Sequence, residues 1–190
     1  TRITSPEGTI HYDYDPATGQ KTRTWTEHSD TRYGYDELGR LSTVTVIKQG
    51  GETLPQPDVT RYAYDAVGHR ESVTLPNGVT TRYTYTNSWL GTLTHRDASS
   101  NLLAAYVHGL NAKGMRTAIT ETKRQGTVSH FGSNSFHYAY DSLGRLTNEV
   151  NRFTDADETG FDAGYEYDLV GNRLQRQVRV GDVVLTTTYV

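Results

Sequence analysis

Short stretches of alternating polar and apolar residues follow one another along the chain, and turn-forming residues separate them. Residues 73–75 and 79–83, for example, flank the sequence Pro-Asn-Gly at 76–78. A period of two in segments rich in Thr, Val and Tyr predicts β-strands, and Pro, Asn and Gly between them predict chain reversals. Helical periodicity is nearly absent; only residues 101–106 fit a helical turn, and we interpret them as a strand. The sequence therefore predicts an all-β chain of successive antiparallel β-hairpins.

The fourteen tyrosines occur in a repeating pattern. Twelve form Tyr-x-Tyr pairs, namely Tyr12/Tyr14, Tyr33/Tyr35, Tyr62/Tyr64, Tyr83/Tyr85, Tyr138/Tyr140 and Tyr165/Tyr167. Tyr106 and Tyr189 stand where further units begin, and successive units start between 21 and 32 residues apart. Such a period is typical of stacked repeats, in which each unit packs only against its neighbours. We therefore expect residues 1–190 to form a single repeat array with a curved, solenoid-like sheet. Its units are expected to begin near residues 12, 33, 62, 83, 106, 138 and 165, with the next at 189, as in a piece of a longer protein.

Four copies share the sequence Tyr-x-Tyr-Asp-x-(Leu/Val)-Gly. Alternate residues of a strand point to one side, so each tyrosine pair is expected to line one face. The Asp carboxylate can accept the backbone N–H two residues on, and the Gly can take the positive φ of a turn followed by a bulge. We predict an architectural role for Tyr, Asp and Gly, and for the Arg of two copies. The residues concerned are Tyr33, Tyr35, Asp36, Gly39, Arg40, Tyr62, Tyr64, Asp65, Gly68, Tyr138, Tyr140, Asp141, Gly144, Arg145, Tyr165, Tyr167, Asp168 and Gly171.

The residue before the turn glycine is apolar in all four copies: Leu38, Val67, Leu143 and Val170. We expect these side chains to fold back under their own or the next hairpin. Arg40 and Arg145 directly follow the glycine. Either they lie over a tyrosine ring of the facing strand, or they are solvated surface residues. The copies between residues 83 and 132 are the least regular, which suggests that the sheet bends or meets another element there.

The composition favours a thin sheet over a thick apolar core. Hydrophobic residues make up 34% of the chain, the mean hydropathy is −0.68, and aromatic residues, mostly Tyr, reach 11%. Tyrosine buries a ring while its hydroxyl reaches water or the backbone. The net charge of −3 is well mixed along the chain, so we expect no binding to nucleic acid or to an anionic membrane. Nor do we expect membrane insertion, because no apolar run is long enough to span a bilayer.

Candidate chemistry is sparse. The chain has no cysteine, and its seven histidines show no metal-binding or catalytic spacing, so we predict neither an enzyme nor a cofactor. One segment fits the ligand spacing of a calcium loop, with Asp155, Asp157, Thr159, Asp162 and Glu166 as oxygen donors. The competing interpretation is an acidic surface loop between two hairpins, because no helix flanks the segment and Glu166 lies between two strand tyrosines.

The repeats resemble a known family. The sequences Tyr-x-Tyr-Asp-x-Leu-Gly-Arg-Leu at 33–41 and 138–146, Tyr-x-Tyr-Asp-x-Val-Gly-Asn-Arg at 165–173 and Leu-Pro-Asn-Gly-Val at 75–79 are similar to the YD repeats of Rhs proteins. Such repeats also occur in bacterial toxin-complex shell subunits and in teneurins. The resemblance covers essentially the whole chain.

The resemblance implies a segment of a hollow, non-catalytic β-shell that encloses a C-terminal toxin or effector. The expected partners are then the rest of the same polypeptide, in a secreted or cell-surface protein, and the lack of cysteine fits a bacterial source. An alternative is a carbohydrate-binding or cell-surface adhesion module, in which exposed tyrosines with Trp25 and Trp89 stack on sugar rings. Exposed sheet edges also predict end-to-end self-association.

Overall fold

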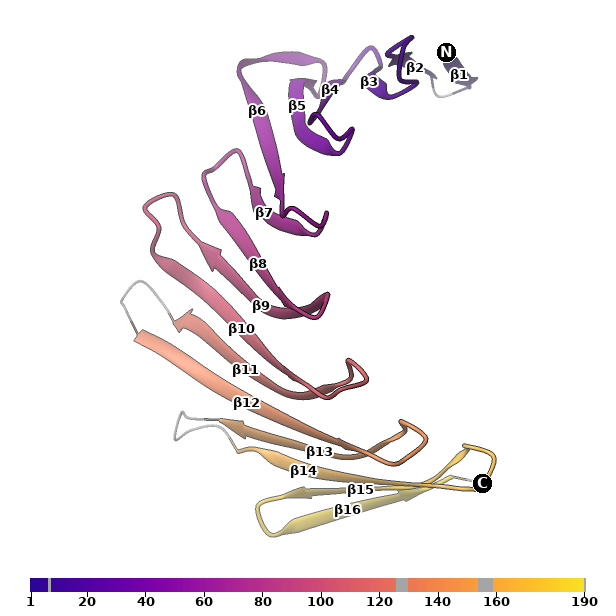
Figure 1. Cartoon of the computed structure of the whole chain (residues 1–190), viewed down its shortest axis with the longest axis vertical. Helices are drawn as coiled ribbons and strands as arrows, with labels where there is room; N and C mark the ends of the chain where they lie inside the picture. Colours follow the sequence, from indigo (N-terminus) through magenta and orange to yellow (C-terminus); the bar gives the residue numbers. More distant parts are fainter. Residues whose placement is uncertain (7, 126–129, 154–158, 190) are drawn as a thin grey trace. The chain divides into compact units, whose positions relative to one another are not determined.

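The computed structural model describes residues 1–6, 8–125, 130–153 and 159–189 and confirms the all-β prediction. All regular elements of this part are β-strands, and their order in the open sheet, β1 to β16, is the order of the sequence. Figure 1 shows this for several consecutive strands, such as β9 and β10 or β15 and β16, which are joined by a reversal of the chain. Among the described residues there is no helix that could cross a membrane.

The chain divides into two compact units, residues 1–82 with 97–99 and residues 83–96 with 100–190. The strands of the first unit are β1 (Arg2–Ser5), β2 (Gly8–Tyr14), β3 (Lys21–Trp25), β4 (Asp30–Tyr35), β5 (Leu41–Gln49), β6 (Glu52–Tyr64) and β7 (Arg70–Thr74). Strand β8 (Thr80–Thr86) begins in the first unit and ends in the second.

The strands of the second unit are β9 (Trp89–Arg96), β10 (Leu102–Leu110), β11 (Arg116–Gln125), β12 (His130–Tyr140), β13 (Leu146–Phe153), β14 (Phe161–Tyr167), β15 (Arg173–Val180) and β16 (Val183–Thr188). The stretch at 101–106 contributes to β10, as the interpretation of it as a strand predicted. Strands β10 and β11 pair antiparallel from Ala104–Lys123 to Leu110–Arg116.

The registers place the tyrosine pairs of the first unit on one face of the sheet. Tyr33 lies opposite Val44, and Tyr62 lies opposite Val73. We call this side the tyrosine face. Because side chains alternate along a strand, residues between the tyrosines, and residues such as Arg61 just before them, point to the other side, which we call the polar face.

The sheet has almost no fully buried interior. Among the described residues, Ala163 is the only buried hydrophobic residue, and the tyrosines of the repeats are mostly half-buried. A single layer of this kind cannot rely on a packed core, because neither face is covered by a second layer of side chains. Contacts between neighbouring strands and hairpins must therefore supply its stability.

The prediction that the apolar turn residues fold back is wrong. Leu38, Val67, Leu143 and Val170 are 74%, 77%, 73% and 84% exposed. The backbone explains this result, because the N–H of each of these residues donates a hydrogen bond to the carboxylate of the turn aspartate. That bond fixes the turn with the apolar side chain at its tip, beyond the last cross-strand pair.

Candidate functional site: the link between repeats

Each Tyr-Asp repeat ends in a turn that the aspartate organises. The Oδ1 atom of Asp36 accepts hydrogen bonds from the backbone N–H groups of Leu38 at 3.0 Å and Arg40 at 2.8 Å. The backbone closes the turn through Asp36 N to Arg40 O at 2.9 Å and Gly39 N to Asp36 O at 2.9 Å. Gly39 has φ 75°, a conformation that residues with a Cβ rarely adopt. The turn glycine is therefore required by the backbone geometry.

The same turn recurs after other strands. Its two closing backbone hydrogen bonds are found at Asp36/Arg40, Asp65/His69, Leu75/Val79, Asn111/Met115, Asp141/Arg145 and Asp168/Asn172. The cross-strand register also shifts immediately before several of these turns, between Gly34/Tyr35, Ala63/Tyr64, Gly109/Leu110, Ala139/Tyr140 and Glu166/Tyr167. The bulge and the turn thus form one structural unit.

The arginine that follows the turn glycine reaches the next repeat. The Nε atom of Arg40 donates to Asp36 Oδ2 at 2.7 Å, which holds the guanidinium beside its own turn. From there Arg40 donates through NH1 to the backbone carbonyl of Asp65 at 3.2 Å. Its guanidinium carbon lies 4.7 Å from the ring centroid of Tyr64. Of the two alternatives left open for Arg40, the structure shows the one in which it lies over a tyrosine ring, and the ring belongs to the following repeat.

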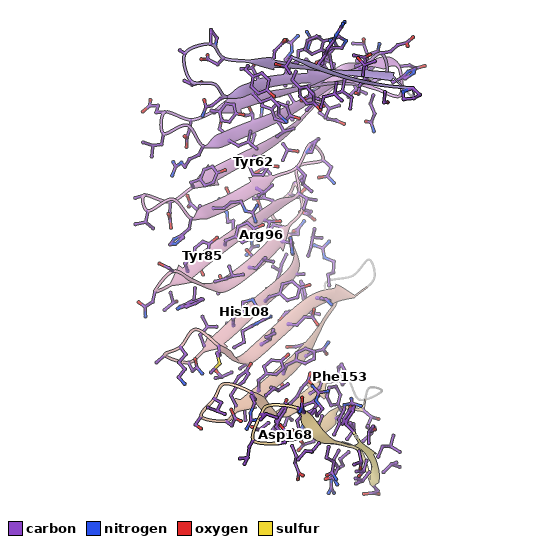
Figure 2. The ribbon with its side chains drawn as sticks, turned by 90° about the vertical axis from the view of Figure 1, so that its right-hand side faces the viewer. Tyr62, Tyr85, Arg96, His108, Phe153 and Asp168 are labelled. Carbon is purple, nitrogen blue, oxygen red and sulfur yellow. The ribbon has the colours of Figure 1, made fainter. Side chains whose placement is uncertain are left out.

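The second tyrosine of the following repeat reaches back. The Tyr64 hydroxyl donates to the backbone carbonyl of Leu41, the residue after Arg40, at 2.9 Å. We call these contacts the inter-repeat link. In it, the arginine of one repeat contacts the second tyrosine ring and the aspartate carbonyl of the next repeat. The hydroxyl of that tyrosine donates back to the strand that follows the arginine. Figure 2 shows the side chains on the strands, with Tyr62 on β6 and Asp168 in the turn after β14 labelled.

The second unit contains a matching link. Arg145 Nε donates to Asp141 Oδ2 at 2.6 Å, and Arg145 NH1 donates to the Asp168 carbonyl at 2.8 Å. The Arg145 guanidinium lies 4.9 Å from the Tyr167 ring centroid. The Tyr167 hydroxyl completes the link by donating to the Leu146 carbonyl at 2.8 Å. The same residue types at the same spacing therefore build the same contacts in both units.

Other residues replace arginine in the remaining repeats. Gln20 Nε2 donates to the Gly39 carbonyl at 2.8 Å, and the Tyr35 hydroxyl donates to the Lys21 carbonyl at 2.8 Å. The Lys21 ammonium lies 4.3 Å from the Tyr33 ring centroid. At the next turn His69 stands in the arginine position, with Nδ1 3.0 Å from Asp65 Oδ2. Gln20 therefore shows that a donor other than arginine can reach the following turn, while the contact of His69 with Asp65 lies within its own turn.

A further turn of this kind is organised by an asparagine, in the unit that the sequence predicted to begin near Tyr106. Asn111 Oδ1 accepts the backbone N–H groups of Lys113 and Met115, as Asp36 does in its own turn. His108 and Leu110 accordingly occupy the register positions of a tyrosine pair. Asn111 is followed three residues later by Gly114, which has φ 74°. The sequence placed the start of this unit at Tyr106, whereas the register places it two residues later, at His108.

The motif carboxylates have little capacity for catalysis. The backbone N–H of Arg145 and then its side chain lower the pKa of Asp141, and the corresponding groups of Arg40 do the same for Asp36. Both oxygens of each carboxylate accept hydrogen bonds from their own turn. A carboxylate that is committed in this way and is a weakened base is poorly suited to proton transfer.

The candidate calcium loop lies only partly in the described part of the chain. Asp155 and Asp157 lie outside the described residues. Asp162 accepts a hydrogen bond from the Asn148 amide at 2.7 Å, and Glu166 lies on β14 opposite Gln175. Thr159 is exposed. Within the described ranges there is no group of three or more His, Asp or Glu residues suited to hold a metal ion.

No family model and no curated protein matches the chain. Crystal structures of TcdB2-TccC3 do match. The structure without the hypervariable C-terminal region has a TM-score of 0.77 and 20% sequence identity over 95% of this chain and 10% of that chain. The TcdB2-TccC3-Cdc42 structure has a TM-score of 0.76 and the same identity and coverage.

The chain thus spans 10% of the length of these structural neighbours. At this level of identity the likeness concerns the fold. The chain therefore has the fold of a stretch of the TcdB2-TccC3 chains, which confirms the resemblance to YD-repeat proteins at the level of the fold.

Proposed function

We propose that this chain is a non-catalytic wall segment of a larger YD-repeat protein. In this proposal residues 1–190 act as one repeat array, and the wall encloses another part of the same polypeptide, a toxin or other effector, in a secreted or cell-surface protein. The observation that carries the proposal is the inter-repeat link. It uses the motif residues for contacts between hairpins in both units.

The alternative of a carbohydrate-binding or adhesion module has less support. Sugar rings stack on open aromatic faces, whereas cations lie over the rings of Tyr33, Tyr64 and Tyr167. Trp25 is stacked on His11 at 4.8 Å and lies under Arg23 at 4.6 Å. These tyrosine rings and Trp25 are thus engaged within the sheet, whereas Trp89 is 50% exposed.

The test uses the longer protein that contains the chain. Arg40→Met and Arg145→Met together remove the guanidinium from both complete links, and limited proteolysis then measures how fast an enclosed segment is cleaved. We expect faster cleavage than in the parent protein, because the wall opens between repeats. The matched control is Arg2→Met with Arg179→Met, two exposed arginines outside the links. Equal cleavage rates for all three proteins would contradict the proposal.

A further inference from the structure

Three arginines of the first unit form a row on its polar face. Arg32, Arg61 and Arg82 each precede the first tyrosine of a pair and therefore point away from the tyrosine face. All three side chains are exposed. We call these residues the arginine row.

The registers fix the spacing of the row. Arg32 lies opposite Thr45, which lies opposite Val59, so Arg61 is displaced by two residues along β6. Arg61 lies opposite Thr74, which in turn lies opposite Thr80. Arg82 is therefore displaced by two residues along β8 from the position level with Arg61. With strands about 4.8 Å apart and a rise of about 3.3 Å per residue, consecutive arginine Cα atoms are about 12 Å apart. The row therefore runs diagonally across the strands at a regular interval.

The charge of the row is largely uncompensated. The acidic residues that the registers place on this face of β2–β8 are Asp13 and Asp30. Both oxygens of Asp30 accept hydrogen bonds from Arg23 at 2.8 Å. These bonds are the main cause of the lowered pKa of Asp30, and the charge of Arg32 makes a smaller contribution. Within the described residues, the three arginines of the row form no ion pair. An otherwise acidic chain thus presents a positive strip on one face.

Hydroxyl groups lie beside each arginine. Arg61 has the cross-strand partners Thr43 and Thr74. Arg32 has Thr45 on one side and Arg23, which is paired with Asp30, on the other. Arg82 has Ser72. A guanidinium flanked by hydroxyls offers several donors to an anionic oxygen, and carboxylate is the anion whose planar shape matches the guanidinium fork.

The partner class follows from what this face lacks. Proteins that bind single-stranded nucleic acid combine positive charge with aromatic rings on which bases stack. Here the tyrosines lie on the opposite face, and Trp25 is already stacked on His11. We infer that the arginine row is a docking surface for an acidic polypeptide, whose Asp and Glu side chains pair with Arg32, Arg61 and Arg82. This inference does not depend on whether the wall encloses an effector.

The test measures binding of fluorescent poly-L-glutamate to the full chain by anisotropy at pH 7 and low salt. The triple variant Arg32→Gln/Arg61→Gln/Arg82→Gln is expected to bind at least about 10-fold more weakly. The control Lys113→Gln/Arg116→Gln/Arg179→Gln removes the same charge from exposed residues of the second unit and is expected to bind nearly as the parent does. Circular dichroism verifies that both variants fold.

Three results would overturn the inference. One is equal affinity of the row variant and the parent chain. Another is an equal loss in the control, which would indicate general charge attraction. The third is tighter, row-dependent binding of oligothymidylate or of a sulfated polysaccharide, which would identify a different class of polyanion.

Discussion

The hydroxyl of the second tyrosine of each pair gives the sharpest test of the inter-repeat link. In the first unit, Tyr35 donates to Lys21 O and Tyr64 donates to Leu41 O. The double substitution Tyr35→Phe/Tyr64→Phe removes both hydroxyls and leaves the rings in place. Rings and cations can therefore keep their contacts, and the change isolates the hydrogen bonds.

The expected loss follows from two half-buried hydrogen bonds to backbone carbonyls. Each contributes about 1 kcal/mol net, so the double variant should lose about 2 kcal/mol of the free energy of unfolding if the separated sites add. With a urea dependence of about 1 kcal/mol per molar, the midpoint should fall by about 2 M. Urea titration followed by far-ultraviolet circular dichroism measures this shift, and hydrogen exchange assigns it to residues 20–64.

The first tyrosines provide a matched control. Within the described residues, the hydroxyls of Tyr33 and Tyr62 make no hydrogen bond, so Tyr33→Phe/Tyr62→Phe should change the midpoint little. If the control lost as much stability as the test variant, the loss would come from the tyrosine face in general. An unchanged midpoint in the test variant would show that the carbonyl contacts do not hold the repeats together.

Two further predictions concern the turn. Gly144 has φ 83°, which a β-branched residue resists, whereas Gly164 lies within β14 with open space at its Cβ position. Gly144→Val should therefore lower the melting temperature clearly more than the control Gly164→Val. Equal effects would refute the assigned turn. The pKa values of Asp36 and Asp141 are lowered in the folded chain, so their ionised carboxylates stabilise the fold at any pH above the unfolded pKa near 3.8. This stabilisation should be lost as the pH falls through the pKa values of the folded chain. Melting curves between pH 7 and about pH 2 should show this loss. The loss should be smaller in Asp36→Asn/Asp141→Asn, and the same acid dependence in both proteins would contradict the prediction.

The sequence was sufficient to predict the fold class and the form of the turn. The three-residue spacing between Asp36 and Gly39 predicted a turn, and Gly39 has the positive φ that this turn requires. The contact of Arg40 with a tyrosine was also predictable as a possibility. These features are local, because they depend on residues a few positions apart in the chain.

Non-local details escaped prediction. The Tyr64 hydroxyl donates to the Leu41 carbonyl because of the strand register and of the bulge before Tyr64. The type of residue at these positions does not predict the register. The exposure of Leu38 was mispredicted, because apolar character alone does not show that the turn projects past the last strand pair. The unit near Tyr106 was expected, but its start was placed two residues too early, because neither Asp nor a tyrosine pair marks the turn at Asn111.

The near absence of a buried core has a consequence for how such a chain can vary in length. A globular domain that gains or loses two strands must repack its interior, whereas here each hairpin contacts mainly the hairpins before and after it. Deleting one whole repeat would remove one link and allow its neighbours to form another of the same kind, as the Gln20 and Arg40 versions suggest. Evolution can therefore lengthen or shorten such a sheet in whole-hairpin steps while the chemistry of each junction stays the same.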